Sequence, residues 1–335
     1  MNYRENAEKR EFEILSDYAA KSSLSKGRNI PEELCSVRTE YQRDRDRIIH
    51  SKAFRRLMHK TQVFLAPEGD HFRTRLTHTI EVSQIARTIA RALSLNEDLT
   101  EAISLGHDLG HTPFGHNGES ILDQIHPNGF QHNVQSIRVV DVLERRGEKR
   151  GMNLTFEVKD GILNHTGPNK PITLEGQIVK ISDRIAYINH DIDDAIRSGV
   201  IAESDLPKDC IEHLGNSHSK RIDTLVMDMI TNSSGKPEIV MSDQCTESMN
   251  KLRAFMFENV YRSSKVKRIE DLKRVNDIVC SLYAYYIENT NMLPNEMQEL
   301  MCEYDANEIV KDHIAGMTDR YAINLYNDLF MPKNW

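Results

Sequence analysis

Apolar side chains recur every three or four residues along most of the chain, and this spacing places them on one face of an α-helix. The pattern is clearest over 77–95, where isoleucines, alanines and a leucine follow the helical period. Asp98 is expected to cap the next helix, which should end between Gly106 and Gly110. Further helices are expected over 117–126, 131–146, 155–165, 172–198, 219–232, 244–259, 267–291, 295–303 and 305–328. The pattern therefore predicts a mainly α fold.

Only one pair of strands is expected. Runs that favour β structure at 62–65 and 71–74 flank a turn at 67–70 that contains Pro and Gly, so a short hairpin is predicted there. Residues 1–37 are polar and charged with weak helical periodicity, and we expect them to form an N-terminal arm. A loop at 233–237 is a candidate hinge before a C-terminal helical part.

Composition narrows the class of protein. The 335 residues are 39% apolar, which is enough for a sizeable core, but the longest apolar runs are only a few residues. No membrane span and no signal peptide is expected, so we predict a cytoplasmic protein. Five cysteines without a CxxC pair argue against a disulfide framework and a zinc knuckle. The net charge of -8 makes generic coating of nucleic acid improbable, although it allows a local cationic pocket.

Four side chains of types that bind metals occur in the order H…HD…D. They are His78, His107, Asp108 and Asp183. His107 and Asp108 are adjacent, so both can reach one ion only if the helix ends there, which the flanking glycines allow. Such a set of imidazoles and carboxylates would hold a divalent cation, polarise a phosphoryl oxygen and lower the pKa of a bound water toward about 7. A His-Asp dipeptide alone is more often structural; the joint pattern reverses those odds.

The helix expected over 172–198 strengthens this interpretation. Its isoleucines form a buried stripe, and Asp183, Tyr187 and Asp191 recur at four-residue steps on the adjoining face. A polar stripe most often faces solvent. Next to a core and in line with a metal ligand, however, it is typical of a pocket wall.

Histidines are dense between 107 and 132, where five of the fourteen fall. Glu119 follows His116 by three residues, so the two can hydrogen-bond on one helical turn and act as a general acid or orient water. His111 lies between the HD pair and this dyad, and His132 opens the next helix, where a structural and a functional role have equal weight. Structural roles are expected for His50, His59, His126, His165, His190, His213, His218 and His313.

Arginines are frequent over 38–56, in a segment with apolar residues at helical spacing. A solvated helix and a phosphate-binding surface explain this cluster equally well from the residues alone.

These motifs resemble the deoxynucleoside triphosphate triphosphohydrolases of the HD-domain phosphohydrolase superfamily, in particular the bacterial dGTPase and dGTPase-like branch. The longest matching segment is HDLGHTPFGHNGE at 107–119. Other matching segments are 42–50, 54–57, 60–64, 75–78 and 182–187, with 255–261 and 315–322 resembling the family's C-terminal associated region. The resemblance implies an HD helical bundle (38–200) and a C-terminal helical associated region (201–335), and it leaves the N-terminal arm (1–37) outside.

The resemblance also implies a reaction and roles. Water would cleave the bond between the α-phosphorus and the 5′-oxygen, which releases a deoxynucleoside and triphosphate. One divalent ion (Mn, Mg, Fe, Zn or Ni) would be held by His78, His107, Asp108 and Asp183, with Mg on the substrate triphosphate. His111 would hold the α-phosphate, His116 with Glu119 would transfer protons, and His132 would be another candidate acid. Substrate binding is implied for Arg56, Gln62, Arg75, Arg184, Tyr187 and Asp191.

Several alternatives stay open from the sequence. The basic cluster over 38–56 fits phosphate binding or an oligomer contact, and the resemblance implies a homo-oligomer, either a tetramer or a hexamer. Asn133 stands where a vertebrate relative carries an acid, which weakens a His-acid pair there. Competing functions are hydrolysis of another nucleotide, such as an alarmone or a 5′-deoxynucleotide, and a nucleotide-sensing or single-strand-binding regulator without turnover.

Overall fold

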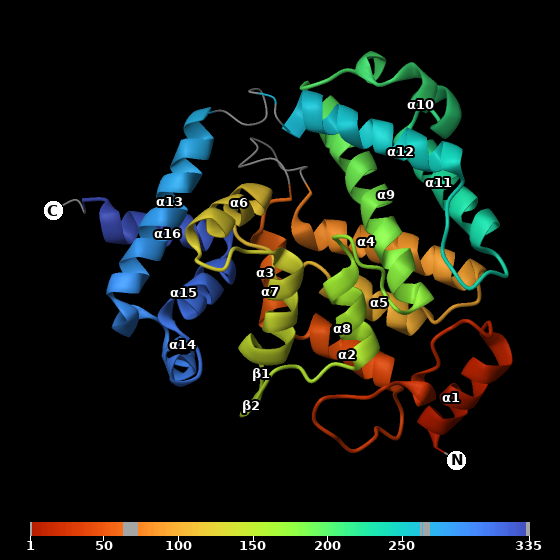
Figure 1. The fold of residues 1–335 in the computed structure, drawn as a ribbon, viewed down its shortest axis with the longest axis horizontal. Coiled ribbons are helices and arrows are strands. Elements are labelled where there is room, and N and C mark those ends of the chain that lie inside the picture. Colours follow the sequence, from red (N-terminus) through yellow and green to blue (C-terminus); the bar gives the residue numbers. More distant parts are fainter. Residues whose placement is uncertain (1, 63–72, 262, 264–268, 333–335) are drawn as a thin grey trace.

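The computed structural model describes residues 2–62, 73–261, 263 and 269–332, and their fold is mainly α as predicted (Figure 1). The first helices are α1 (Tyr3–Ile14), α2 (Glu40–Ile49), α3 (Lys52–Arg56), α4 (Arg75–Ala92), α5 (Glu97–Gly106), α6 (Gly115–Ile125), α7 (His132–Arg138), α8 (Phe156–Asn164) and α9 (Leu174–Arg197). They are followed by α10 (Lys208–Leu214), α11 (His218–Ser233), α12 (Asp243–Met256), α13 (Ile269–Glu288), α14 (Asn295–Gln298), α15 (Ala306–Ala315) and α16 (Asp319–Phe330). A small antiparallel hairpin pairs β1 (Arg145–Arg146) with β2 (Lys149–Arg150).

Helix α5 lies at the centre of the main core, packed against α2, α4, α8 and α9. Two glycines allow the close approach of α5 to α8. A Cβ on Gly106 would lie 2.5 Å from Cδ1 of Ile162, and one on Gly161 would lie 2.5 Å from Cδ1 of Ile103. The core therefore fixes the end of α5, where the HD pair begins.

A second apolar cluster joins α6 to the C-terminal helices. Phe114, Leu122 and Phe130 are buried in the same cluster as residues of α13, α15 and α16. Figure 1 shows α6 lying beside α13. Helix α6 carries His116 and Glu119, so its position depends on the C-terminal region as well as on the main core.

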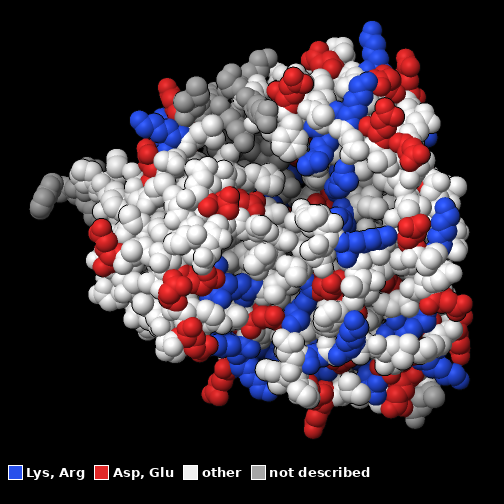
Figure 2. All heavy atoms as spheres, viewed as in Figure 1, with Lys and Arg blue, Asp and Glu red and all other residues white. Residues whose placement is uncertain are grey.

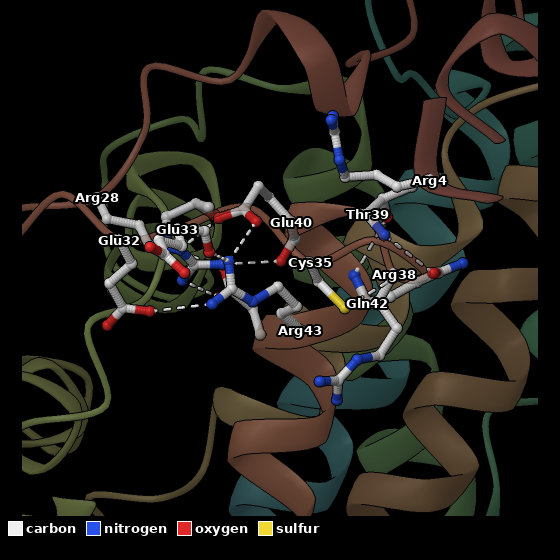
Figure 3. Close-up of polar contacts among 12 residues, drawn as sticks. Arg4, Arg28, Glu32, Glu33, Cys35, Arg38, Thr39, Glu40, Gln42 and Arg43 are labelled. Atoms are coloured by element: carbon white, nitrogen blue, oxygen red, sulfur yellow. Dashed lines mark hydrogen bonds and ion pairs between the residues drawn. The ribbon is translucent and has the colours of Figure 1, made fainter. Parts of the chain in front are cut away.

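The arginines of 38–56 are mostly engaged in ion pairs within the chain (Figure 3). Arg43 pairs with Glu32 and Glu40, and Arg38 with Asp46. Further inside, Arg28 from the arm pairs with Glu40 and Asp44, whose side chain is fully buried. These contacts tie the arm to α2. These ion pairs also neutralise much of the positive charge of the arginine cluster, for which phosphate binding and an oligomer contact were the predicted roles.

Several predicted boundaries were wrong for local reasons. Asn96, not Asp98, caps α5, because its side chain accepts from the Leu99 N–H at 3.1 Å. The helix predicted over 131–146 ends at Leu143, where a π-helical turn leads into the hairpin. The helix predicted over 305–328 is two helices, because Thr318 caps α16. Helices α1 and α10 were not predicted.

The hairpin predicted over 62–74 falls mostly on residues 63–72, which lie outside the described residues. An isolated antiparallel bridge between Thr61 and Thr74 is present beside them.

Of the helices within the described ranges, none is long and apolar enough to cross a bilayer. Figure 2 shows acidic and basic side chains interspersed over the face in view.

Candidate active site

Three helices bring the predicted metal ligands together. His78 lies in the first turn of α4, Asp183 lies in the middle of α9, and His107 is the C-cap of α5 with Asp108 in the turn that follows. Because α5 ends at Gly106, the backbone turns between neighbouring residues, and both His107 and Asp108 face the same point. The sequence analysis required the helix to end here if the adjacent His107 and Asp108 were to reach one ion, and α5 does end at Gly106.

The distances place the four ligand groups within reach of one ion. Asp183 Oδ1 lies 3.0 Å from His78 Nε2 and 3.8 Å from His107 Nε2, and His107 Nε2 lies 3.3 Å from Asp108 Oδ1. His78, His107 and Asp108 also form a buried group whose ligand atoms are mutually close enough to hold a metal ion. Asp183, which lies on the helix face predicted to form a pocket wall, is next to this group through its contact with His78.

Hydrogen bonding shows that these residues fit a cation. His107 Nδ1 donates to the Ser104 carbonyl at 2.6 Å, so Nε2 is the ring nitrogen that faces the two carboxylates. This Nε2 is buried and has no hydrogen-bond partner among the described residues. An imidazole held through one nitrogen by a backbone carbonyl, with the other nitrogen facing carboxylates, is arranged as a metal ligand is. The site therefore suits a divalent metal.

Both carboxyl groups are held in the ionised form. Burial acts to raise the pKa of Asp183, but the hydrogen bond with His78 and the neighbouring His107 outweigh it and lower the pKa well below its usual range. Burial also acts to raise the pKa of Asp108, but the neighbouring His107, His111 and Arg75 outweigh it and lower that pKa. Two buried carboxylates beside two imidazoles form a donor set that suits a divalent ion.

The ligand cluster opens into a cavity of about 400 Å³, within the range of roughly 300–1,000 Å³ common for ligand pockets. Its lining combines cationic, imidazole, amide, aromatic and acidic groups. The lining residues are Gln62, Arg75, His78, Asp108, His111, His116, Asn117, His132, His165, Thr166, Asp183, Tyr187, Asp191, Arg253, Phe257 and Tyr261.

Arg75 is the most informative of the lining residues. Its side chain is 1% exposed, and Nη1 donates to Asp108 Oδ2 at 3.1 Å. Its Nε and Nη2 are buried and without a hydrogen-bond partner among the described residues. A buried guanidinium on a cavity wall, with two donor nitrogens that no described residue uses, is suited to bind an anion.

Glu119 connects the candidate acids. It accepts from the His132 backbone N–H at 2.9 Å and from His132 Nδ1 at 2.8 Å, and it lies 3.4 Å from His116 Nδ1. Burial acts to raise the pKa of Glu119, but hydrogen bonds from His116 and His132 outweigh it, so the group stays a carboxylate. His111 stacks on His132 with ring centroids 3.9 Å apart. Glu119, His116, His132 and His111 therefore form one contiguous group.

His165 was predicted to be structural, but it lines the cavity. Burial and the nearby His107 and His132 lower the pKa of His165 to about 3, so the ring is neutral. Its Nδ1 donates to the Ile162 carbonyl at 2.7 Å, and its Nε2 lies 3.2 Å from His132 Nε2. The Nε2 of His165 can therefore accept a hydrogen bond from His132 Nε2, while Glu119 accepts from the other ring nitrogen of His132.

Tyr187 and Asp191 also face the cavity, from α9. The Tyr261 hydroxyl donates to Asp191, and burial raises the pKa of that carboxyl to about 7. Gln62 Oε1 is buried and without a partner among the described residues. These groups offer hydrogen bonds to hydroxyls beside flat aromatic surfaces.

Two residues predicted to bind substrate do not line this cavity. Arg56 lines a separate small cavity with Lys52 and Lys60, and Arg184 donates to Asn250 Oδ1 at 2.8 Å. In turn, Arg253 and Tyr261 line the cavity and were not predicted, because α12 and the turn after it meet α9 only in the folded chain.

Comparisons with known proteins agree with this geometry. The HD domain family model matches residues 75–188, and that of the phosphohydrolase-associated domain matches 239–328. A deoxyguanosinetriphosphate triphosphohydrolase-like protein of Caldanaerobacter subterraneus subsp. tengcongensis is 60% identical over all of this chain and 98% of its own. The chain belongs to this family.

Further members of the dGTPase-like family show the same full-length match. Proteins of the same name from Desulfatibacillum aliphaticivorans and Clostridium tetani are 48% and 47% identical, each over 99% of this chain and at least 97% of their own. The chain is therefore a hydrolase of the HD phosphohydrolase class, with a His/Asp cluster that could hold a divalent metal.

Proposed function

We propose that this dGTPase-like protein hydrolyses deoxynucleoside triphosphates to a deoxynucleoside and inorganic triphosphate. The observation that carries the proposal is the convergence of His78, His107, Asp108 and Asp183 at a cavity that also presents a buried arginine with free donors. When bound there, a divalent ion would supply Lewis-acid polarisation of a phosphoryl oxygen and an acidified water.

The protein's own groups suit the charge of the triphosphate. Arg75 offers two N–H donors that no described residue uses, and Arg253 adds a second guanidinium to the lining. Burial, with Arg75 and His132 nearby, lowers the pKa of His111, so a neutral ring, with Nε2 3.1 Å from Asp108 Oδ1, lies beside the place that we assign to the α-phosphate. Together they hold the phosphates beside the metal ligands.

Hydrolysis at the α-phosphorus requires a proton for the departing 5′-oxygen. Glu119 hydrogen-bonds both candidate donors, His116 and His132. His132 is the better buried of the two, with 14% of its side chain exposed against 67% for His116. We therefore assign the donor role to His132 and an orienting role at the cavity mouth to His116. The variant His132→Gln is expected to lose more of kcat than His116→Gln.

The sugar is held by the acid-Tyr-acid face of α9. Asp191 and Gln62 can accept from and donate to the 3′-hydroxyl, and to the bulky ring of Tyr187, which also lines the cavity, we assign the exclusion of a 2′-hydroxyl. This arrangement supports a deoxynucleotide over an alarmone.

The test is a product analysis. The purified chain is incubated with Mn²⁺ or Mg²⁺ and each of the four dNTPs, and the products are separated by ion-exchange chromatography. Deoxynucleoside and tripolyphosphate in equal amounts support the proposal. Deoxynucleoside monophosphate with pyrophosphate, or no turnover of any dNTP, contradicts it.

A further inference from the structure

The segment 315–322 joins the C-terminal region to the wall of the active site. Within it, Asp319 lies in the first turn of α16 and does not line the cavity. Its Oδ1 accepts from the Phe114 N–H at 2.9 Å, and its Oδ2 accepts from the Thr61 N–H at 3.0 Å and from the Thr61 hydroxyl. One carboxylate thus ties together two segments that are far apart in the sequence.

Each of these segments carries a residue of the cavity. Thr61 precedes Gln62, and Phe114 lies two residues before His116. The close approach of the two segments is visible at Gly115, where a Cβ would lie 3.0 Å from the Gln62 carbonyl oxygen. A shift of Phe114 or Thr61 would therefore displace a cavity residue directly.

Phe114 also needs an external restraint. It adopts the left-handed conformation, with φ of 64°, which a side chain other than glycine disfavours by roughly 1–2 kcal/mol. It is the N-cap of α6, yet its side chain makes no capping hydrogen bond. The carboxylate of Asp319 satisfies the Phe114 N–H and places a negative charge at the positive end of the α6 dipole.

A lysine beside this carboxylate strengthens the same junction. Lys60 Nζ is buried and donates to the carbonyl oxygens of His111 and Ala315. It therefore holds the segment that leads from the HD pair to Phe114 against the C-terminal end of α15. Asp319 and Lys60 thus both hold the segment 111–114 that leads into α6.

We propose that Asp319 is a positioning residue that fixes the start of α6, and with it His116 and Glu119, relative to the metal ligands. Asp319 would thereby help to complete the active site without itself touching the substrate. This inference rests on the proposed function for its kinetic readout. Misplacement of a reacting group by about 1 Å can lower a rate about 100-fold.

The test compares Asp319→Ala with Asp328→Ala, which removes an exposed carboxylate from the same helix. We expect kcat to fall about 10- to 100-fold in Asp319→Ala and to stay within twofold of wild type in Asp328→Ala. Asp319→Asn keeps an acceptor for Phe114 and should lose less. Bound metal per chain should equal that of wild type in all three variants, because no metal ligand contacts Asp319.

A combined variant separates positioning from general stability. If Asp319 acts through the start of α6, Asp319→Ala should lower kcat less than twofold further in a background that carries both His116→Ala and Glu119→Ala. The same fold-loss in both backgrounds would overturn the proposal, and so would a kcat of Asp319→Ala within twofold of Asp328→Ala.

Amide hydrogen exchange gives a readout that needs no activity. Exchange over 111–119 should be faster in Asp319→Ala than in wild type and Asp328→Ala. If wild type hydrolyses no dNTP, the proposed function fails, and unchanged exchange in Asp319→Ala then overturns the positioning role independently.

Discussion

Replacing Arg75 tests whether the cavity holds a polyanion. The variant Arg75→Ala removes the two N–H donors, Nε and Nη2, that no described residue uses, together with the bond to Asp108. A hydrogen bond to a charged group contributes about 1.5–3 kcal/mol, so two bonds to phosphate oxygens amount to about 3–6 kcal/mol. At about 1.4 kcal/mol for each factor of ten, kcat/KM for a dNTP should fall about 10²- to 10⁴-fold.

Two further variants identify the cause of that loss. Arg75→Lys keeps the positive charge but loses the planar fork, so its kcat/KM should lie between those of wild type and Arg75→Ala. Arg91→Ala removes an exposed arginine of the same helix, whose ion pair with Glu97 is on the surface, and should leave kcat/KM unchanged. The assay is steady-state release of deoxynucleoside, with bound metal measured on each variant. A value for Arg75→Ala within threefold of wild type, at equal metal content, would refute the reasoning.

Three other outcomes follow from the structure. Burial raises the pKa of Glu175 to about 7 from an ordinary 4.5, so the folded state binds more protons in this window and stability falls as pH rises through it. Glu175→Gln should remove that loss, by up to about 3 kcal/mol between pH 4.5 and 8 in urea unfolding, and an unaltered pH slope would contradict it. A Cβ on Gly110 would lie 2.2 Å from the Ser136 backbone nitrogen. Gly110→Ala should therefore lower the free energy of unfolding by about 3 kcal/mol. An unchanged urea midpoint would disprove this clash. Tyr187→Ala should lower the preference for dNTP over NTP in kcat/KM at least tenfold, and an unchanged ratio would remove Tyr187 from sugar selection.

The metal cluster could be predicted because its signal is local. The HD dipeptide is contiguous, the flanking glycines indicate a helix end, and Asp183 falls on a periodic face with Tyr187 and Asp191. Each of these features is decided by neighbours within one helix or turn. The structure brings Asp183 close to His107 and Asp108, which the local patterns alone do not determine.

Other parts of the wall could not be predicted, because they depend on packing between distant helices. His165 is a single histidine at the end of α8 with no periodic partner, and only the approach of α8 to α7 places it beside His132. Arg253 and Tyr261 face the cavity because α12 packs on α9. In the sequence, Asp319 is an ordinary acidic residue in the first turn of a helix. Its contact with the start of α6 exists only in the folded chain.

The central claim is that His78, His107, Asp108 and Asp183 hold one divalent ion. Crystals of the full chain grown with Mn²⁺, measured at the manganese absorption edge, test it most directly. We expect one strong anomalous peak about 2.0–2.3 Å from a ligand atom of each of the four residues. A peak elsewhere, or a well-ordered site in which Asp183 turns away from the other three, would contradict the account.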